Sequence, residues 1–144
     1  MTDTIQDLEN RAYGPDITEE ERILLRTQVS LLDGEILFWR EAPVPSISQL
    51  DIYAEKMSEL TAGLEQFYLL VDLSRSARPG PEILEHIRKI MQPQTRLMHA
   101  AIFTGMNFMV NIGAKFLLAR MGIKSYSIHK NQADALGAIN DVRK

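Results

Sequence analysis

The sequence predicts an α/β fold: a mixed, mainly parallel sheet that a β-hairpin opens, with about four helices packed on it. Asp33-Gly34 lies between two apolar segments and indicates the hairpin, because both turn positions must tolerate a positive φ. Phe67–Ser74 and Leu97–Phe103 are apolar runs of the length of buried strands. Helical periodicity separates these runs, so the strands are joined by crossovers and run parallel.

The chain is long enough for one domain, and we expect no second domain. It has 144 residues, of which 45% are hydrophobic. Residues 1–22 form an acidic, weakly periodic leader that we expect to be loosely attached, and Thr18 with Glu21 offers a capping box for a short helix within it. Residues 23–144 are predicted to form the single α/β domain.

The hairpin strands are predicted over residues 26–32 and 35–40, and Pro43 and Pro45 end the second. Ser46 and Gln49 form a capping box for the next helix. Apolar residues then recur at helical spacing and give this helix one buried face. They are Ile47, Leu50, Tyr53, Met57, Leu60 and Leu64.

After the strand at residues 67–73, Pro81 suits the first turn of a second helix, and Pro93 stops that helix. Its predicted buried face consists of Ile83, Leu84, Ile87, Ile90 and Met91. A strand over residues 97–103 leads to a long apolar helix from about residue 107 to residue 121.

Tyr126 and Ile128 alternate with serines in a short strand, and Asn131 starts a final helix. The predicted buried face of that helix is Ala133, Leu136, Ile139 and Val142. The loops that follow Leu73, Phe103 and His129 should gather at one edge of the sheet, where α/β proteins place their sites.

Composition and missing motifs exclude several classes of function. The formal net charge of −3 gives no basic footprint for nucleic acid, and the chain contains no cysteine. We expect a cytoplasmic protein without a membrane span, because no signal segment or long apolar stretch occurs. The three histidines lack metal-ligand spacing, and no phosphate loop, nucleophile elbow or dinucleotide fingerprint is present. The sequence therefore predicts no catalytic residue, no metal and no cofactor.

Two loops at the predicted edge carry the candidate binding residues. The first contains Asp72, Ser74, Arg75, Ser76 and Arg78, which suit an anion or a partner peptide. The competing interpretation is a solvated loop whose serines and aspartate satisfy local backbone groups.

The second loop holds Thr104, Gly105 and Asn107 and opens the long helix, where free amides suit a negative group or are simply capped. Phe108 and Met109 add more apolar surface than one buried stripe absorbs. They favour docking of a partner or of an apolar ligand, with packing against the sheet as the alternative.

The element order, with strands that end Val71-Asp72-Leu73-Ser74 and Ala101-Ile102-Phe103-Thr104-Gly105, resembles the STAS superfamily, which includes bacterial anti-sigma-factor antagonists. It looks closest to the STAS-like branch that is compared with Sec14-type lipid-binding domains. The resemblance covers roughly residues 24–144 and depends on element order and strand character.

The resemblance implies a loop with an acid-Ser-Ser-Gly motif, whose serine is phosphorylated to control partner binding. Here the loop is shorter, and no hydroxyl precedes Gly80 directly. Ser74 and Ser76 are the substitute phosphoacceptors, beside Arg75 and Arg78.

We therefore expect a non-catalytic regulatory module that binds a protein partner. The alternative hypothesis is a carrier or sensor of a lipid or another apolar small molecule. A homo-oligomer is compatible with either function.

Overall fold

The computed structural model describes residues 7–105, 118, 123 and 125–144. The described elements are α1 (Glu19–Arg26), β1 (Val29–Leu32), β2 (Ile36–Arg40), α2 (Ile47–Thr61), β3 (Phe67–Asp72), α3 (Pro81–Met91), β4 (Leu97–Phe103), β5 (Tyr126–His129) and α5 (Gln132–Arg143). They form a five-stranded sheet in the order β1-β2-β3-β4-β5, with β1 antiparallel to β2 and the other pairs parallel. The predicted fold class is confirmed.

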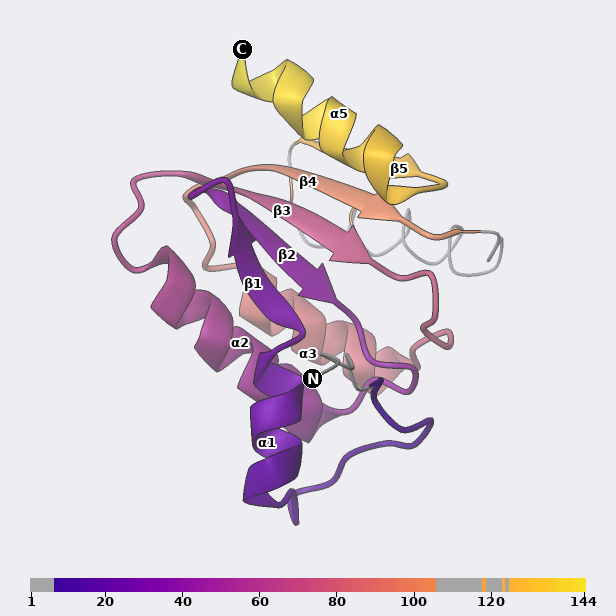
Figure 1. Cartoon of the computed structure of the whole chain (residues 1–144). Coiled ribbons are helices and arrows are strands. Elements are labelled where there is room, and N and C mark those ends of the chain that lie inside the picture. Colours follow the sequence, from indigo (N-terminus) through magenta and orange to yellow (C-terminus); the bar gives the residue numbers. More distant parts are fainter. Residues whose placement is uncertain (1–6, 106–117, 119–122, 124) are drawn as a thin grey trace, which may run out of the picture.

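The helices are distributed unequally over the two faces of the sheet. Figure 1 shows α1, α2 and α3 on one face and α5 on the other. The strand order follows the sequence order without reversal. Right-handed crossovers that all advance in one direction put their helices on the same face. Only a helix outside the crossovers, such as α5, is then available for the second face.

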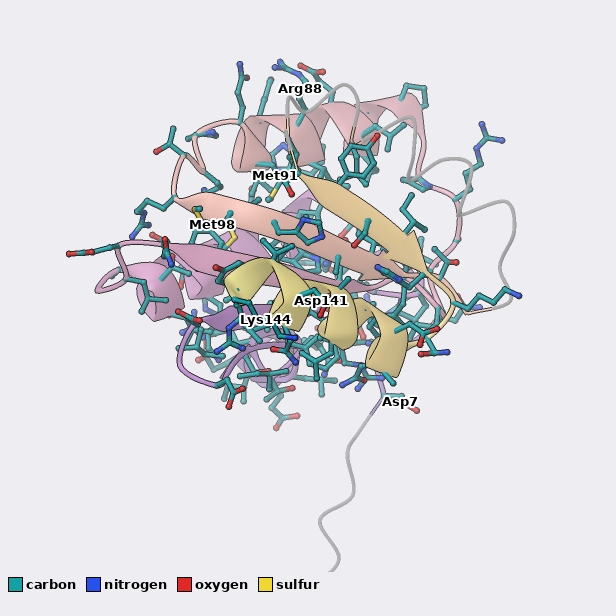
Figure 2. The ribbon with its side chains drawn as sticks, turned by 90° about the horizontal axis from the view of Figure 1, so that it is seen from above. Asp7, Arg88, Met91, Met98, Asp141 and Lys144 are labelled. Atoms are coloured by element: carbon teal, nitrogen blue, oxygen red, sulfur yellow. The ribbon has the colours of Figure 1, made fainter. Side chains whose placement is uncertain are left out.

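Two cores of different size result. The larger core lies on the α2 and α3 face, and the smaller one lies beneath α5. The buried members of the smaller core are Ile36, Tyr68, Leu70, Ala101, Phe103, Ala135 and Ile139. Figure 2 views the molecule from the α5 side, and α5 contacts β3, β4 and β5.

Local signals account for most element boundaries. Asp33 and Gly34 have φ values of 51° and 74°, which confirms the predicted hairpin turn. Thr18 and Ser46 both form the predicted capping boxes, with Glu21 and Gln49. The first hairpin strand begins later than predicted, because α1 continues to residue 26.

The described part of the leader is packed on the domain, which differs from the expected loose attachment. Leu8 and Tyr13 are buried in the larger core. The Tyr13 carbonyl also accepts a 2.6 Å hydrogen bond from Ser46 Oγ, at the start of α2. An aromatic ring and a backbone contact thus hold this segment against the helix.

The predicted buried face of α5 was partly wrong. Ile139 and Leu136 pack in the smaller core, but Ala133 is exposed and Val142 is 43% exposed. Ala135 is fully buried instead. Because α5 is the only described helix on its face, a narrow stripe of the helix meets the sheet and its flanks contact solvent.

The predicted helix from residue 107 to residue 121 lies mostly outside the described residues. Of this segment the structure describes Leu118, which is buried in the larger core. None of the described helices is long and apolar enough to cross a membrane.

Candidate functional site

The loops after β3, β4 and β5 meet at one edge of the sheet, as predicted. Thr104 N–H donates to the His129 carbonyl at 3.0 Å, and Gly105 N–H donates to the Lys130 carbonyl at 2.8 Å. A Cβ added to Gly105 would lie 3.3 Å from the Ser74 Cβ. We call residues 41–43, 72–80, 104–105 and 129–130 the carboxyl edge. The described sheet has no reversal of strand order, so the crevice that α/β proteins form at such a reversal does not arise within it.

Asp72 and Ser74 form a compact turn at the end of β3. Asp72 is 7% exposed, and its Oδ1 accepts hydrogen bonds from Ser74 N–H at 2.9 Å and from Ser74 Oγ at 2.6 Å. Its Oδ2 lies 3.5 Å from Arg40 Nε. The carboxylate thus satisfies the local backbone and orients the Ser74 hydroxyl, while the Ser74 residue itself is exposed.

The two arginines of this loop have different environments. Arg75 Nε donates to the Glu41 carbonyl at 3.2 Å, and its Nη2 donates to Gln28 Oε1 at 2.8 Å. Its Nη1 lies 3.4 Å from Asp7 Oδ1, and Asp7 is labelled in Figure 2. Arg75 therefore holds the edge together. Arg78 is exposed and has no ion pair with any residue that the structure describes.

The two candidate phosphoacceptors differ in accessibility. Ser76 is 3% exposed, and its Oγ donates to the Ala42 carbonyl at 2.9 Å. Ser74 is exposed. A kinase reaches an exposed hydroxyl without opening the fold, so the geometry distinguishes Ser74 from Ser76.

The second loop is described only in part. Thr104 is 2% exposed, and Gly105 has a φ of 62°, a conformation that favours glycine. Asn107, Phe108 and Met109 lie outside the described residues, so the predicted docking surface at the start of this helix and the apolar-ligand hypothesis that depends on it stay predictions.

Sequence reasoning missed Glu41, a buried carboxylate at the end of β2. Its Oε1 accepts from Ala42 N–H at 2.9 Å and from Gln49 Nε2 at 2.7 Å, and its Oε2 accepts from Trp39 Nε1 at 3.2 Å. Burial raises the pKa of Glu41, and the three donors and Arg75 partly offset this rise. The sequence did carry one signal that could have revealed Glu41: it is an acidic residue directly after an apolar strand, at the carboxyl edge.

Tyr53 completes this buried cluster. Its hydroxyl donates to the Arg40 carbonyl at 2.7 Å, and its ring packs edge-on against Trp39 with centroids 5.1 Å apart. Burial, followed by the nearby Glu41 charge, raises the pKa of the Tyr53 hydroxyl. The cluster thus joins α2 to the end of β2, beneath the loop that carries Ser74.

Among the described residues, no group of three or more His, Cys, Asp or Glu side chains is placed to hold a metal ion. Comparisons with family models, with curated proteins and with solved structures find no match to this chain.

Proposed function

We propose that this protein is a non-catalytic regulatory module, similar to the anti-sigma-factor antagonists of the STAS superfamily, and that it binds a protein partner through the carboxyl edge in the cytoplasm. The observation that carries the proposal is Ser74, an exposed hydroxyl held by Asp72 where two loops meet beside Gly105.

The internal hydrogen bonding of the edge supports binding rather than chemistry. Asp72, Arg75 and Ser76 all use polar atoms to hold neighbouring backbone or side chains. A surface ordered in advance loses less conformational entropy when a partner binds. The exposed Arg78 adds a charge that a partner carboxylate or phosphate can pair with.

Photocrosslinking tests the surface directly. A photoreactive residue placed at Ala77 or Arg78, both exposed at the edge, should give a discrete protein adduct in cells that make this protein natively. The matched control is Glu65, which is exposed before β3, at the opposite end of the strands. Equal adducts at all three positions, or none at the edge, would contradict the proposal.

Native mass spectrometry tests the alternative function. A stoichiometric apolar molecule bound to the purified protein would favour a carrier instead.

Phosphopeptide mapping tests the regulatory part of the proposal. Phosphate should be found on Ser74 and not on the enclosed Ser76. Ser74→Glu should weaken the edge adduct at least about tenfold, because a second carboxylate beside Asp72 repels it and opens the turn, whereas Ser74→Ala should change it less. An adduct that is insensitive to Ser74→Glu would remove the phosphorylation control from the proposal.

A further inference from the structure

A buried histidine joins the last two strands of the sheet. His99 of β4 is 6% exposed. Its Nδ1 lies 2.6 Å from Ser125 Oγ, and its Nε2 lies 2.9 Å from Ser127 Oγ. Both ring nitrogens are therefore bonded to serine hydroxyls that come from β5 or from the residue directly before it.

A second imidazole shares one of these hydroxyls. His129 Nε2 lies 2.7 Å from Ser127 Oγ. All three hydrogen bonds form when both rings are neutral: His129 Nε2–H donates to Ser127 Oγ, Ser127 O–H donates to His99 Nε2, and His99 Nδ1–H donates to Ser125 Oγ. These proton positions are assigned from the network and the side-chain inventory.

Protonation of His99 disrupts this arrangement. A proton on Nε2 removes the acceptor of the Ser127 hydroxyl, and it places a buried positive charge near a second imidazole. Burial lowers the pKa of His99, and the charge of nearby His129 lowers it further.

Within residues 7–105, 118, 123 and 125–144, no charged side chain forms an ion pair or a hydrogen bond with His99; its two hydrogen-bond partners are serines. Tyr68 of β3 pairs in register with His99. From α5, the Arg143 guanidinium lies 6.0 Å from the centre of the Tyr68 ring, and its Nε is 2.8 Å from Glu35 Oε1 and thus already paired.

The network holds the end of the described sheet. β5 pairs with β4 through four register pairs, from Ala100–Tyr126 to Phe103–His129, and with no other described strand. α5 follows β5 directly and supplies Ala135 and Ile139 to the smaller core. Separation of β5 from β4 would therefore loosen the attachment of α5, whose Ala135 and Ile139 complete that core.

We propose that protonation of His99 releases β5 and α5 from β4, so that mild acid opens the smaller core of this protein. This inference does not depend on the proposed function. Because the folded state disfavours the proton, the contribution of His99 to stability is present above its ordinary pKa of 6.5 and is lost as the pH falls below that value.

Amide hydrogen exchange of the full chain tests the opening. Protection factors of the β5 and α5 amides should fall between about pH 7.5 and about pH 5, by about tenfold for each unit by which the His99 pKa is lowered. The β3 amides should keep their protection. Equal loss in β3 and β5, or no loss in either, would overturn the proposal.

Two variants identify the titrating group. His129→Gln removes the second imidazole but keeps His99, so one cause of the lowered His99 pKa is lost and the pH-dependent loss of protection should shrink. His86→Gln is the matched control, because His86 lies on α3 and pairs with Asp51 at 2.7 Å, away from the network. This variant should behave like the parent protein. The reverse pattern, with the loss unchanged in His129→Gln and reduced in His86→Gln, would contradict the proposal, and neither variant alters His99 itself.

The side-chain signals of the three histidines give an independent measurement by NMR titration. In the parent protein the His99 ring should titrate below 6.5, and in His129→Gln it should move toward that value. A His99 ring that titrates at or above its ordinary value would overturn the assignment.

Discussion

Glu41 and His99 are two buried titratable side chains on opposite faces of the same sheet, and their hydrogen-bond partners differ in kind. Glu41 is bonded by N–H groups of Ala42, Trp39 and Gln49, which can only donate. His99 is bonded by hydroxyls of Ser125 and Ser127, which either donate or accept. The N–H donors favour the ionised form of the Glu41 carboxylate, against the effect of burial, whereas the serine hydroxyls match the neutral His99 ring, because one donates to Nε2 and the other accepts from Nδ1–H.

The two sites should therefore respond to pH in opposite directions. The pKa of Glu41 is raised and that of His99 is lowered. The stability that depends on Glu41 falls as the pH rises above 4.5, the ordinary pKa of a glutamate. The stability that depends on His99 falls as the pH drops below 6.5, the ordinary pKa of a histidine. The predictions below test this contrast between the faces, beginning with the largest effect.

Core truncation should cost more on the larger face. Leu50 and Ile139 are both fully buried, in the larger and the smaller core respectively. Leu50→Ala should lower the free energy of unfolding by about 4 kcal/mol and Ile139→Ala by about 2 kcal/mol, because the half-covered α5 face relaxes around a cavity more easily. Urea denaturation measures both values. An equal or larger loss for Ile139→Ala would break the comparison.

Glu41→Gln should show how much the titration of the Glu41 carboxyl contributes to stability. The variant keeps the size of the side chain but turns one acceptor into a donor, so it should be about 1 kcal/mol less stable at low pH. Because the raised pKa destabilises wild type as the pH rises, the difference between the two proteins should shrink above pH 4.5. Urea denaturation of both proteins at a series of pH values from below to above 4.5 measures this stability difference. A gap that widens with pH would contradict the sign.

Glycine substitutions should separate backbone strain from crowding at the carboxyl edge. Gly105→Ala combines a φ of 62° with a contact 3.3 Å from Ser74, so it should cost about 2 kcal/mol in the free energy of unfolding. Gly34→Ala has a φ of 74° in open space and should cost about 1 kcal/mol.

Gly63→Ala is the control for these two variants, because a Cβ at Gly63 meets nothing within 4 Å. Its stability should stay within about 0.5 kcal/mol of wild type. Thermal or urea unfolding ranks the three proteins. If Gly34→Ala proved as costly as Gly105→Ala, crowding against Ser74 would contribute nothing.

The smallest effect is expected on the surface of α3. Arg88 Nη2 lies 2.6 Å from Glu85 Oε1, and Arg88 is labelled at the outer side of the helix in Figure 2. Arg88→Ala should leave the urea-denaturation midpoint close to that of wild type, because exposed ion pairs are screened by water. A loss comparable with that of Ile139→Ala would show that the surface of α3 matters as much as the smaller core.

Local chemistry made the fold predictable. Asp33-Gly34 specified its turn, Ser46 and Gln49 specified the start of α2, and the apolar run at Phe67 specified β3. Parallel crossovers then determined that the loops after Leu73 and Phe103 meet. Each of these conclusions uses neighbours in sequence or a general rule of chain handedness.

The buried polar clusters were not predictable in this way. Glu41 meets Gln49 and Arg75, and His99 meets Ser127, only because the register between strands and helices places them together. A single sequence carries no signal for that register beyond the alternation of faces. The prediction of the buried face of α5 was partly wrong for a related reason, since periodicity does not say how wide a stripe of the helix the sheet covers.

The strand order has a consequence for how the chain is made. Each strand pairs with the one synthesised just before it, so the sheet can grow during translation by adding one edge at a time. Ile36, Leu70 and Phe103, however, are left without their helix until residues 132–143 have been made. A nascent chain therefore exposes an apolar sheet surface until α5 has been made, which is the kind of surface that a ribosome-associated chaperone would shield.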